Sequence, residues 1–167
     1  MRVRYRHSIP GWLCLVRFEK RLRYQAKVTW DRESGGLVEC ENCGDLRLDM
    51  PREFSGLGRS PCPDQLFLSA IGGCLLTTFL HFKRRLGLDV EGVDISVSAE
   101  IALDPSEGYR IRSIRAVMSV EADAEEADLA RRCAELARDY CHITRSIESA
   151  IPLAVSIEPV TPRSSGQ

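Results

Sequence analysis

A long and almost uniformly apolar segment between Pro63 and Gly87 limits the possible folds of this chain more than any other feature. Its body, Leu66 to Phe82, is apolar on nearly every side when drawn as a helix, and such a helix belongs in a core rather than on a surface. Pro63 suits the first helical position, and Asp64 places negative charge near the positive end of the helix dipole. Three basic residues and then Gly87 end the segment, as expected of a helix C-terminus.

Alternating apolar and polar residues predict strands on both sides of this helix. Three strands precede it, at residues 23–30, 37–39 and 45–50. After it, residues 93–103 and a second long strand around 114–120 predict an antiparallel hairpin. A helix from about Asp123 to Tyr140, a short helix at 142–150 and a strand at 153–157 complete the order. We therefore predict an α+β fold with an antiparallel sheet, a long buried central helix and a second helix.

The length and composition favour one folded domain. The chain has 167 residues, of which 44% are hydrophobic and 28% charged, with a formal net charge of −1. Disorder would require low hydrophobicity and a high net charge, and a nucleic-acid partner would usually require a basic surface. We expect a basic extension at residues 1–22, a single domain at 23–160 and a disordered tail at 161–167.

No membrane or secretion signal is expected from the sequence. No uninterrupted apolar run approaches the ~18 residues typical of a transmembrane helix. The apolar stretch Gly11–Val16 follows several arginines, but it is shorter than the ~7–15 residue core of a secretory signal. We therefore expect a cytoplasmic protein with no membrane partner.

Two of the seven cysteines stand out by their context. An odd number in a chain that is not a short secreted one predicts reduced thiols, and any disulfide is expected to be catalytic. Cys74 lies in the middle of the apolar helix, where a cysteine is commonly a buried and inert hydrophobe. However, Gly72 and Gly73 precede it, at a cost of about 1 kcal/mol each relative to alanine. This pair is explained if another backbone or a substrate approaches the thiol.

Cys141 lies at the predicted junction of two helices. If the following residues are helical, its sulfur lies near a helix N-terminus, where thiolate is stabilised. His142 follows directly in the sequence, but adjacent residues need not face each other. We interpret His142 as a solvated residue of the junction.

Both cysteines lie in segments that resemble the motifs of the OsmC/Ohr family. Residues 63–74, PDQLFLSAIGGC, resemble its first motif, in which a Pro-acid-x-Leu segment leads into a helix with a cysteine ten residues after the acid. Residues 140–146, YCHITRS, resemble its second motif. The strands between the cysteines and the final apolar strand also fit, so the resemblance extends from Tyr24 to Glu158.

The resemblance implies a thiol-dependent peroxidase. Cys74 would reduce an organic hydroperoxide and become a sulfenic acid, and Cys141 would then close a disulfide with it. An external dithiol, such as that of a lipoyl protein, would reset the enzyme without any cofactor. Leu66, Phe67 and Ile71 would form apolar walls that favour organic substrates. The resemblance also implies an intertwined homodimer.

An arginine and a carboxylate assist the first cysteine in the family. Asp64 matches the carboxylate position, although the Ohr branch typically has glutamate there, and it has proline where this chain has His142. Arg32 is the best match for the arginine; the alternative is a solvated turn residue. These departures indicate that the chain belongs to an OsmC-like branch other than the Ohr branch.

Cys40 and Cys43 form the remaining candidate site. A Cys-x-x-Cys around a tight hairpin turn is typical of half a zinc ribbon, but the sequence contains no second pair of this kind. We therefore assign no metal and keep the two as weak candidates. Two other function classes remain open: a binding protein that holds a small hydrophobic ligand without peroxidase activity, and a zinc-stabilised interaction protein.

Overall fold

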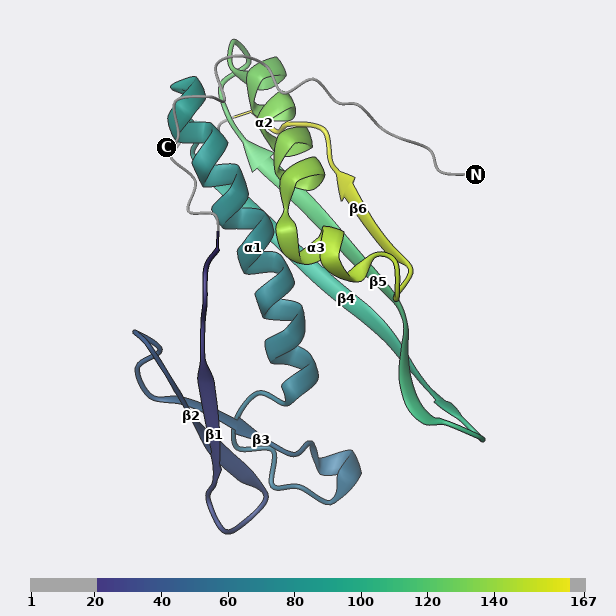
Figure 1. Ribbon diagram of the computed structural model, residues 1–167. Helices are drawn as coiled ribbons and strands as arrows, with labels where there is room; N and C mark the ends of the chain where they lie inside the picture. Colours follow the sequence, from purple (N-terminus) through teal and green to yellow (C-terminus); the bar gives the residue numbers. More distant parts are fainter. Residues whose placement is uncertain (1–20, 163–167) are drawn as a thin grey trace, which may run out of the picture.

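The computed structural model describes residues 21–162 as two three-stranded sheets linked by one long helix (Figure 1). The order of elements is the predicted one: three strands, a long helix, two strands, two helices and a strand. Most of the predicted basic extension, Cys14 and the last five residues lie outside the described residues. The fold is α+β, as the sequence predicted.

The first sheet is antiparallel and stands apart from the helices in Figure 1. Its strands are β1 (Ala26–Trp30), β2 (Gly35–Cys40) and β3 (Leu46–Asp49). The alternation in β1 predicted a half-buried strand, and this is wrong for the single chain: Val28 is 58% and Trp30 66% exposed. Nothing in the described chain covers the apolar face of this strand.

Arg59, in the loop that leads into the long helix, ties that loop to the first sheet. Its Nε donates to the Asp49 Oδ2 at 2.8 Å, and its backbone N–H donates to the same oxygen at 2.9 Å. Its other guanidinium nitrogens pair with Asp31, at 2.6 Å, and with Glu33. Asp49 is only 1% exposed and also accepts a hydrogen bond from the Ser34 hydroxyl at 2.6 Å. A buried carboxylate with these partners is fully satisfied.

Helix α1 (Pro63–Leu86) begins and ends as the sequence predicted. Pro63 takes the first position, the Gln65 side chain accepts a hydrogen bond from the Cys62 N–H at 2.9 Å, and Gly87 ends the helix with a φ of 66°. One face is buried, and its members are Ile71, Cys74, Leu75, Phe79 and Phe82. Burial on every side was expected, but Leu80 is 45% exposed. Part of the apolar surface of α1 is therefore uncovered in one chain.

By length and composition alone, α1 could cross a membrane. A helix at the core of a globular protein meets the same criterion. The buried face of α1 packs against α2 and the second sheet, so its apolar character is explained by the fold.

The second sheet consists of β4 (Gly92–Asp104), β5 (Gly108–Glu121) and β6 (Leu153–Ile157). β4 and β5 form the predicted antiparallel hairpin, but β6 pairs with β5 in parallel. The prediction of an antiparallel sheet is wrong at this position. The reason is the connection: α2 (Ala127–Tyr140) and α3 (His142–Ile147) lie between β5 and β6, and a crossover of this length returns the chain in the same direction.

The pairing with β5 continues beyond β6. Thr161, which the sequence assigned to the disordered tail, forms an isolated parallel bridge with Glu121. Its N–H donates to the Val120 carbonyl at 3.0 Å, and its carbonyl accepts from the Ala122 N–H at 3.1 Å. The ordered domain therefore extends at least one residue past the predicted boundary.

Helix α2 packs against α1 through small residues. Ala130, Cys133, Ala134 and Ala137 are fully buried between the helices and the second sheet. Because these side chains are short, the two helices can approach closely, and Phe79 of α1 is also completely buried. Full burial of one such aromatic side chain contributes about 1.5–3 kcal/mol.

The contacts of Asp49 generate a pH-dependent stability prediction. Its hydrogen bond from Arg59, first, and those from Ser34 and the backbone lower the pKa of Asp49 well below the ordinary value of 3.8. The ionised carboxylate therefore stabilises the fold above that value, and this contribution is lost as the pH falls through the lowered pKa. We expect Asp49→Asn to reduce the free energy of unfolding at pH 7 and the deficit to shrink below about pH 4. Urea unfolding followed by tryptophan fluorescence measures this.

Glu33→Gln is the matched control, because Glu33 pairs with the same arginine but is exposed. Its effect should be much smaller, since surface ion pairs contribute little. An Asp49→Asn deficit that is equal at pH 7 and pH 3 would contradict the assignment.

Candidate functional site

Cys74 and Cys141 lie together in the core although they are far apart in the sequence. Cys74 is on the buried face of α1 and 6% exposed, and Cys141, between α2 and α3, is fully buried. Both are free thiols, and Cys141 lies close enough to raise the pKa of Cys74. The structure thus brings together the two cysteines that the sequence singled out.

The junction between α2 and α3 explains the position of Cys141. Its backbone is extended, with φ −62° and ψ 114°, so the helix stops there and a second one starts in a new direction. The Cys141 N–H donates to the Ala137 carbonyl at 3.0 Å, and the Cys141 carbonyl accepts from Arg145 at 3.2 Å. One residue therefore caps both helices, and its side chain is directed into the core.

The surroundings of Cys74 act in opposite directions on its acidity. Burial is the largest effect and raises the pKa of the Cys74 thiol, because it disfavours the charged form. The Ile143 N–H lowers the pKa, the neighbouring Cys141 raises it, and the Thr78 hydroxyl lowers it. The net pKa of Cys74 is raised, so the thiol needs further help to become a nucleophile at neutral pH.

His142 is placed differently from the interpretation made on the sequence. Its side chain is exposed, as expected of a junction residue. However, its Nδ1 lies 3.4 Å and its Nε2 3.9 Å from the Cys74 Sγ. The interpretation as a merely solvated residue is therefore wrong. Two adjacent residues of a chain rarely approach the same atom. Here the sharp turn at Cys141 brings α3 back toward α1, so that both Cys141 and His142 lie near the Cys74 sulfur.

Arg32 and Asp64 are not joined in the structure. Arg32 is exposed in the turn after β1, with a φ of 72°, and Asp64 is exposed in the first turn of α1. Within residues 21–162 of one chain, no hydrogen bond or ion pair connects Arg32 to Asp64 or to Cys74. The arginine with several carboxylate partners is Arg59, which sequence reasoning missed because its partners come from separate segments.

Two of the three predicted pocket residues share the face of Cys74. Phe67, Ile71 and Cys74 follow the i, i+4, i+7 spacing that places side chains on one side of a helix. Ile71 is fully buried in the core, so it packs beneath the thiol instead of forming an open wall. Phe67 and Leu66 are half-buried and remain candidates for the wall.

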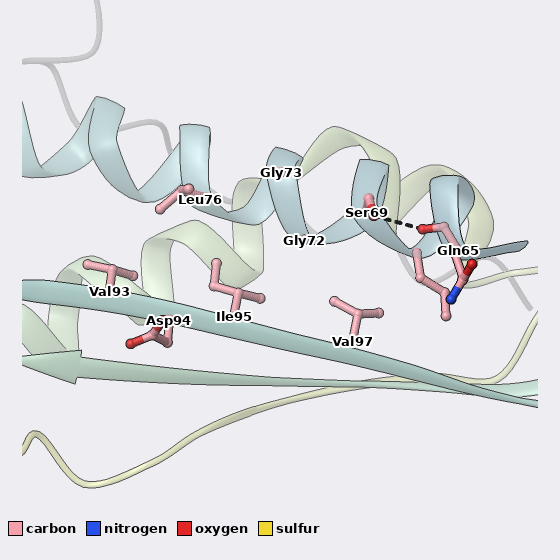
Figure 2. Close-up of a pocket in the computed structure, with 10 residues that line it drawn as sticks. Gln65, Ser69, Gly72, Gly73, Leu76, Val93, Asp94, Ile95 and Val97 are labelled. Atoms are coloured by element: carbon pink, nitrogen blue, oxygen red, sulfur yellow. Dashed lines mark hydrogen bonds between the residues drawn. The ribbon is translucent and has the colours of Figure 1, made fainter. Parts of the chain in front are cut away.

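A groove of about 590 Å³ lies between α1 and β4 (Figure 2). In Figure 2, Val93, Ile95 and Val97 of β4 point toward the helix. A Cβ on Gly72 would lie 3.3 Å from the Val97 side chain, so this glycine permits close packing of α1 on β4. The expected reason for Gly72, an approach to the thiol, is not the one found. Gly73 borders open space.

The remaining cysteines differ from the Cys74–Cys141 pair. Cys40 and Cys43 are joined in a disulfide at the tip of the β2–β3 hairpin, contrary to the expectation of reduced thiols. A disulfide has no thiolate to offer a metal, and residues 21–162 contain no cluster of three or more His, Cys, Asp or Glu side chains that could hold one. Burial raises the pKa of Cys133 to about 11, and its thiol donates to the Phe79 carbonyl at 3.4 Å.

Comparison with known proteins agrees with this fold. The Bacillus subtilis protein YmaD, described as uncharacterized, is 26% identical over 137 residues, which cover 78% of this chain and 89% of that protein. A crystal structure of an organic hydroperoxide resistance protein OsmC from Legionella pneumophila has a TM-score of 0.61 at 22% identity, covering 84% of this chain and 99% of that one. The OsmC-like protein of Mycoplasma pneumoniae has a TM-score of 0.69 at 15% identity, covering 86% and 99%.

The fold and the site define a class of α+β proteins with two thiols at the centre of a helix-covered sheet. The model of the OsmC family, described as OsmC-like protein, matches residues 56–156. This match covers more than half of the chain and contains both Cys74 and Cys141. The chain belongs to the OsmC-like family.

The disulfide at the hairpin tip gives a labelling prediction. We expect iodoacetamide at pH 8 to leave Cys40 and Cys43 unmodified until a phosphine reductant is added, because disulfide sulfurs are not alkylated. Half-buried Cys62, a free thiol, is the internal control and should react without reduction. Peptide mass spectrometry identifies each site. A zinc site would give the opposite result, with the pair released by a chelator and not by a reductant.

Proposed function

We propose that the protein is a thiol-dependent peroxidase that reduces organic hydroperoxides through Cys74 and Cys141. The observation that carries this proposal is the close approach of the two free thiols at a buried site. Two neighbouring thiols can form a disulfide, and a buried site limits access by water. Several proteins of the same fold are named organic hydroperoxide resistance proteins.

The first step uses Cys74 as the nucleophile. Its thiolate attacks the terminal oxygen of the hydroperoxide, and the O–O bond breaks. The sulfur gives up two electrons and becomes a sulfenic acid, while the alkoxide leaves and takes a proton to become the alcohol. Phe67 packs against the core cluster that contains Cys74, and with half-buried Leu66 it would form an apolar wall that favours an alkyl or acyl substituent on the peroxide.

The second step uses Cys141. Its sulfur attacks the sulfur of the Cys74 sulfenic acid, the S–O bond breaks, and water leaves with the Cys141 proton. The net reaction converts one hydroperoxide and two thiols into an alcohol, water and a disulfide. An external dithiol, such as that of a lipoyl protein, would reduce this disulfide. No metal or organic cofactor takes part in the proposed cycle, and we expect it to take place in the cytoplasm.

We further propose that the working form is an intertwined homodimer. The apolar face of β1 and the exposed part of α1 need cover that one chain does not supply. A partner that covers them could also bring its Arg32 to Cys74 and Asp64, where the guanidinium would bind the peroxide and the carboxylate would orient it. This would explain why the two residues are exposed and apart in one chain.

The alternative function is a binding protein for a small hydrophobic ligand without peroxidase activity. The groove between α1 and β4, lined by Leu68, Leu76 and valine and isoleucine side chains of β4, favours it. This groove lies on the other face of α1 from Cys74, so the two functions can be tested separately.

We predict that Cys74→Ser abolishes the consumption of an organic hydroperoxide in the presence of a dithiol, because a serine hydroxyl does not supply a thiolate. Cys141→Ser should complete one turnover and then stall, with Cys74 held as sulfenic or sulfinic acid. Rapid-mixing kinetics and intact mass spectrometry measure both effects. Cys133→Ala is the matched control and should keep full activity, since the raised pKa of Cys133 leaves it a thiol. Full activity in Cys74→Ser would refute the proposal.

We also predict a dimer at micromolar concentration in sedimentation velocity. Trp30→Glu, on the exposed apolar face of β1, should shift the protein toward the monomer, because a charge in an apolar interface is costly. Lys27→Glu, at a charged position of the same strand, is the control and should leave the dimer intact. A wild-type monomer would count against the assembly.

A further inference from the structure

The imidazole of His142 is the charged or chargeable side chain that lies against the Cys74 sulfur. Its Nδ1 and Nε2 are 3.4 Å and 3.9 Å from Sγ, so the ring edge that carries Nδ1 faces the sulfur. The other groups that influence the pKa of Cys74, after its burial, are the Ile143 N–H, the Cys141 thiol and the Thr78 hydroxyl. Within residues 21–162, no lysine or arginine is among its hydrogen-bond partners.

We propose that His142 is a catalytic residue that takes the proton of Cys74 and, as imidazolium, holds the thiolate. The inference rests on the proposed function for its role in turnover, but the activation of the thiol can be tested without a peroxide. A neighbouring imidazole is a general way to activate a thiol nucleophile, and an imidazolium next to sulfur stabilises the thiolate.

The need for such a partner follows from burial. A thiol with 6% exposure in a cluster of apolar side chains holds its proton more tightly than one in water. The Ile143 N–H is a neutral group, the Thr78 hydroxyl already donates to the Cys74 backbone carbonyl at 2.7 Å, and the adjacent Cys141 thiol works against ionisation. A base in contact with the sulfur offsets this effect directly.

The other titratable groups on the elements packed against α1 are directed elsewhere. On α2, Cys133 contacts the Phe79 carbonyl and the Tyr140 ring packs against Phe82, both farther along the helix. On β4, Asp94 lines the groove on the opposite face of α1. His142 and Cys141 are therefore the titratable groups that face Cys74.

The position of His142 suits proton exchange as well as contact. Its side chain is exposed, so the ring can exchange protons with water while its Nδ1 edge meets the sulfur. Its backbone is held by the Ser146 hydroxyl, which donates to the His142 carbonyl at 2.7 Å. Cys141 and His142 thus reach the same sulfur, one from the core and one from the surface.

With His142 as the base, the proton released by the thiol in the first step is the one that the leaving alkoxide receives. His142 accepts the thiol proton, which leaves a thiolate and an imidazolium. The thiolate attacks the terminal peroxide oxygen, the O–O bond breaks, and the leaving alkoxide takes the proton from the imidazolium. The products are the Cys74 sulfenic acid, the alcohol and a neutral imidazole, ready for the next cycle.

The test is the pH dependence of Cys74 alkylation by iodoacetamide in the reduced, full-length protein, read by peptide mass spectrometry. His142→Gln keeps a polar side chain but cannot take a proton at these pH values. We expect the variant to lower the rate at pH 7 by at least tenfold and to move the midpoint of the profile to higher pH. The two proteins should converge at alkaline pH, where the thiol ionises unaided.

His81→Gln is the matched control, because His81 is an exposed histidine on α1 that contacts the Phe82 ring and not the thiol. Its profile should superimpose on that of the wild type. Arg145→Ala removes an exposed cation of α3 and should leave the midpoint unchanged, which distinguishes the effect of a proton acceptor from that of a nearby cation. Unfolding midpoints of all variants should agree with the wild type, so that the rate change reflects chemistry.

Two results separate this inference from the proposed function. If the profile of His142→Gln superimposes on the wild-type profile, His142 does not activate the thiol and the inference is overturned, whatever the peroxidase activity. If the profile shifts as expected but the wild type consumes no hydroperoxide, the Cys74–His142 pair is supported and the peroxidase is refuted. If both hold, His142→Gln should reduce kcat/KM for hydroperoxide by about 100-fold, the lower range for general acid–base catalysis.

Discussion

The burial of one face of α1 against α2 and the second sheet is the constraint on which the rest of the structure depends. That face carries Ile71, Leu75 and Phe79, all fully buried, and Cys74 lies among them. The packing that stabilises the domain therefore also fixes the thiol. Because the facing residues of α2 are mostly alanines, the two helices approach closely. The turn at the end of α2 then places Cys141 next to Cys74.

Burial has a chemical cost, since it stabilises the thiol over the thiolate that reactivity requires. The chain places polar groups near the Cys74 sulfur within an otherwise apolar core: a backbone N–H of α3 and the ring of His142. Both come from the segment that follows Cys141. The short break between α2 and α3 thus supplies both the second thiol, Cys141, and the polar groups near the Cys74 sulfur.

The order of the elements and the limits of most of them could be predicted from residue patterns, because the period of apolar residues depends on local backbone geometry. Helix α1 is the clearest case, with Pro63 at its start and Gly87 after its end. The direction of β6 could not be predicted in the same way. It depends on the connection through α2 and α3, and on which edge of the sheet is free. The exposure of β1 likewise depends on what covers it, which no local pattern records.

For the site, the sequence by itself singled out the residues to which the proposed chemistry is assigned and placed them in two motifs in a fixed order. It identified Cys74 and Cys141, and it predicted a buried helix around the first of them. Only the tertiary structure decided which side chains meet the sulfur. Arg59 is engaged by carboxylates of the first sheet, Arg32 lies apart from the thiol in one chain, and His142 contacts it. The physical reason is that a side chain's partners depend on turns such as that at Cys141, which bring distant segments together over a few ångströms and leave no periodic signal in the sequence.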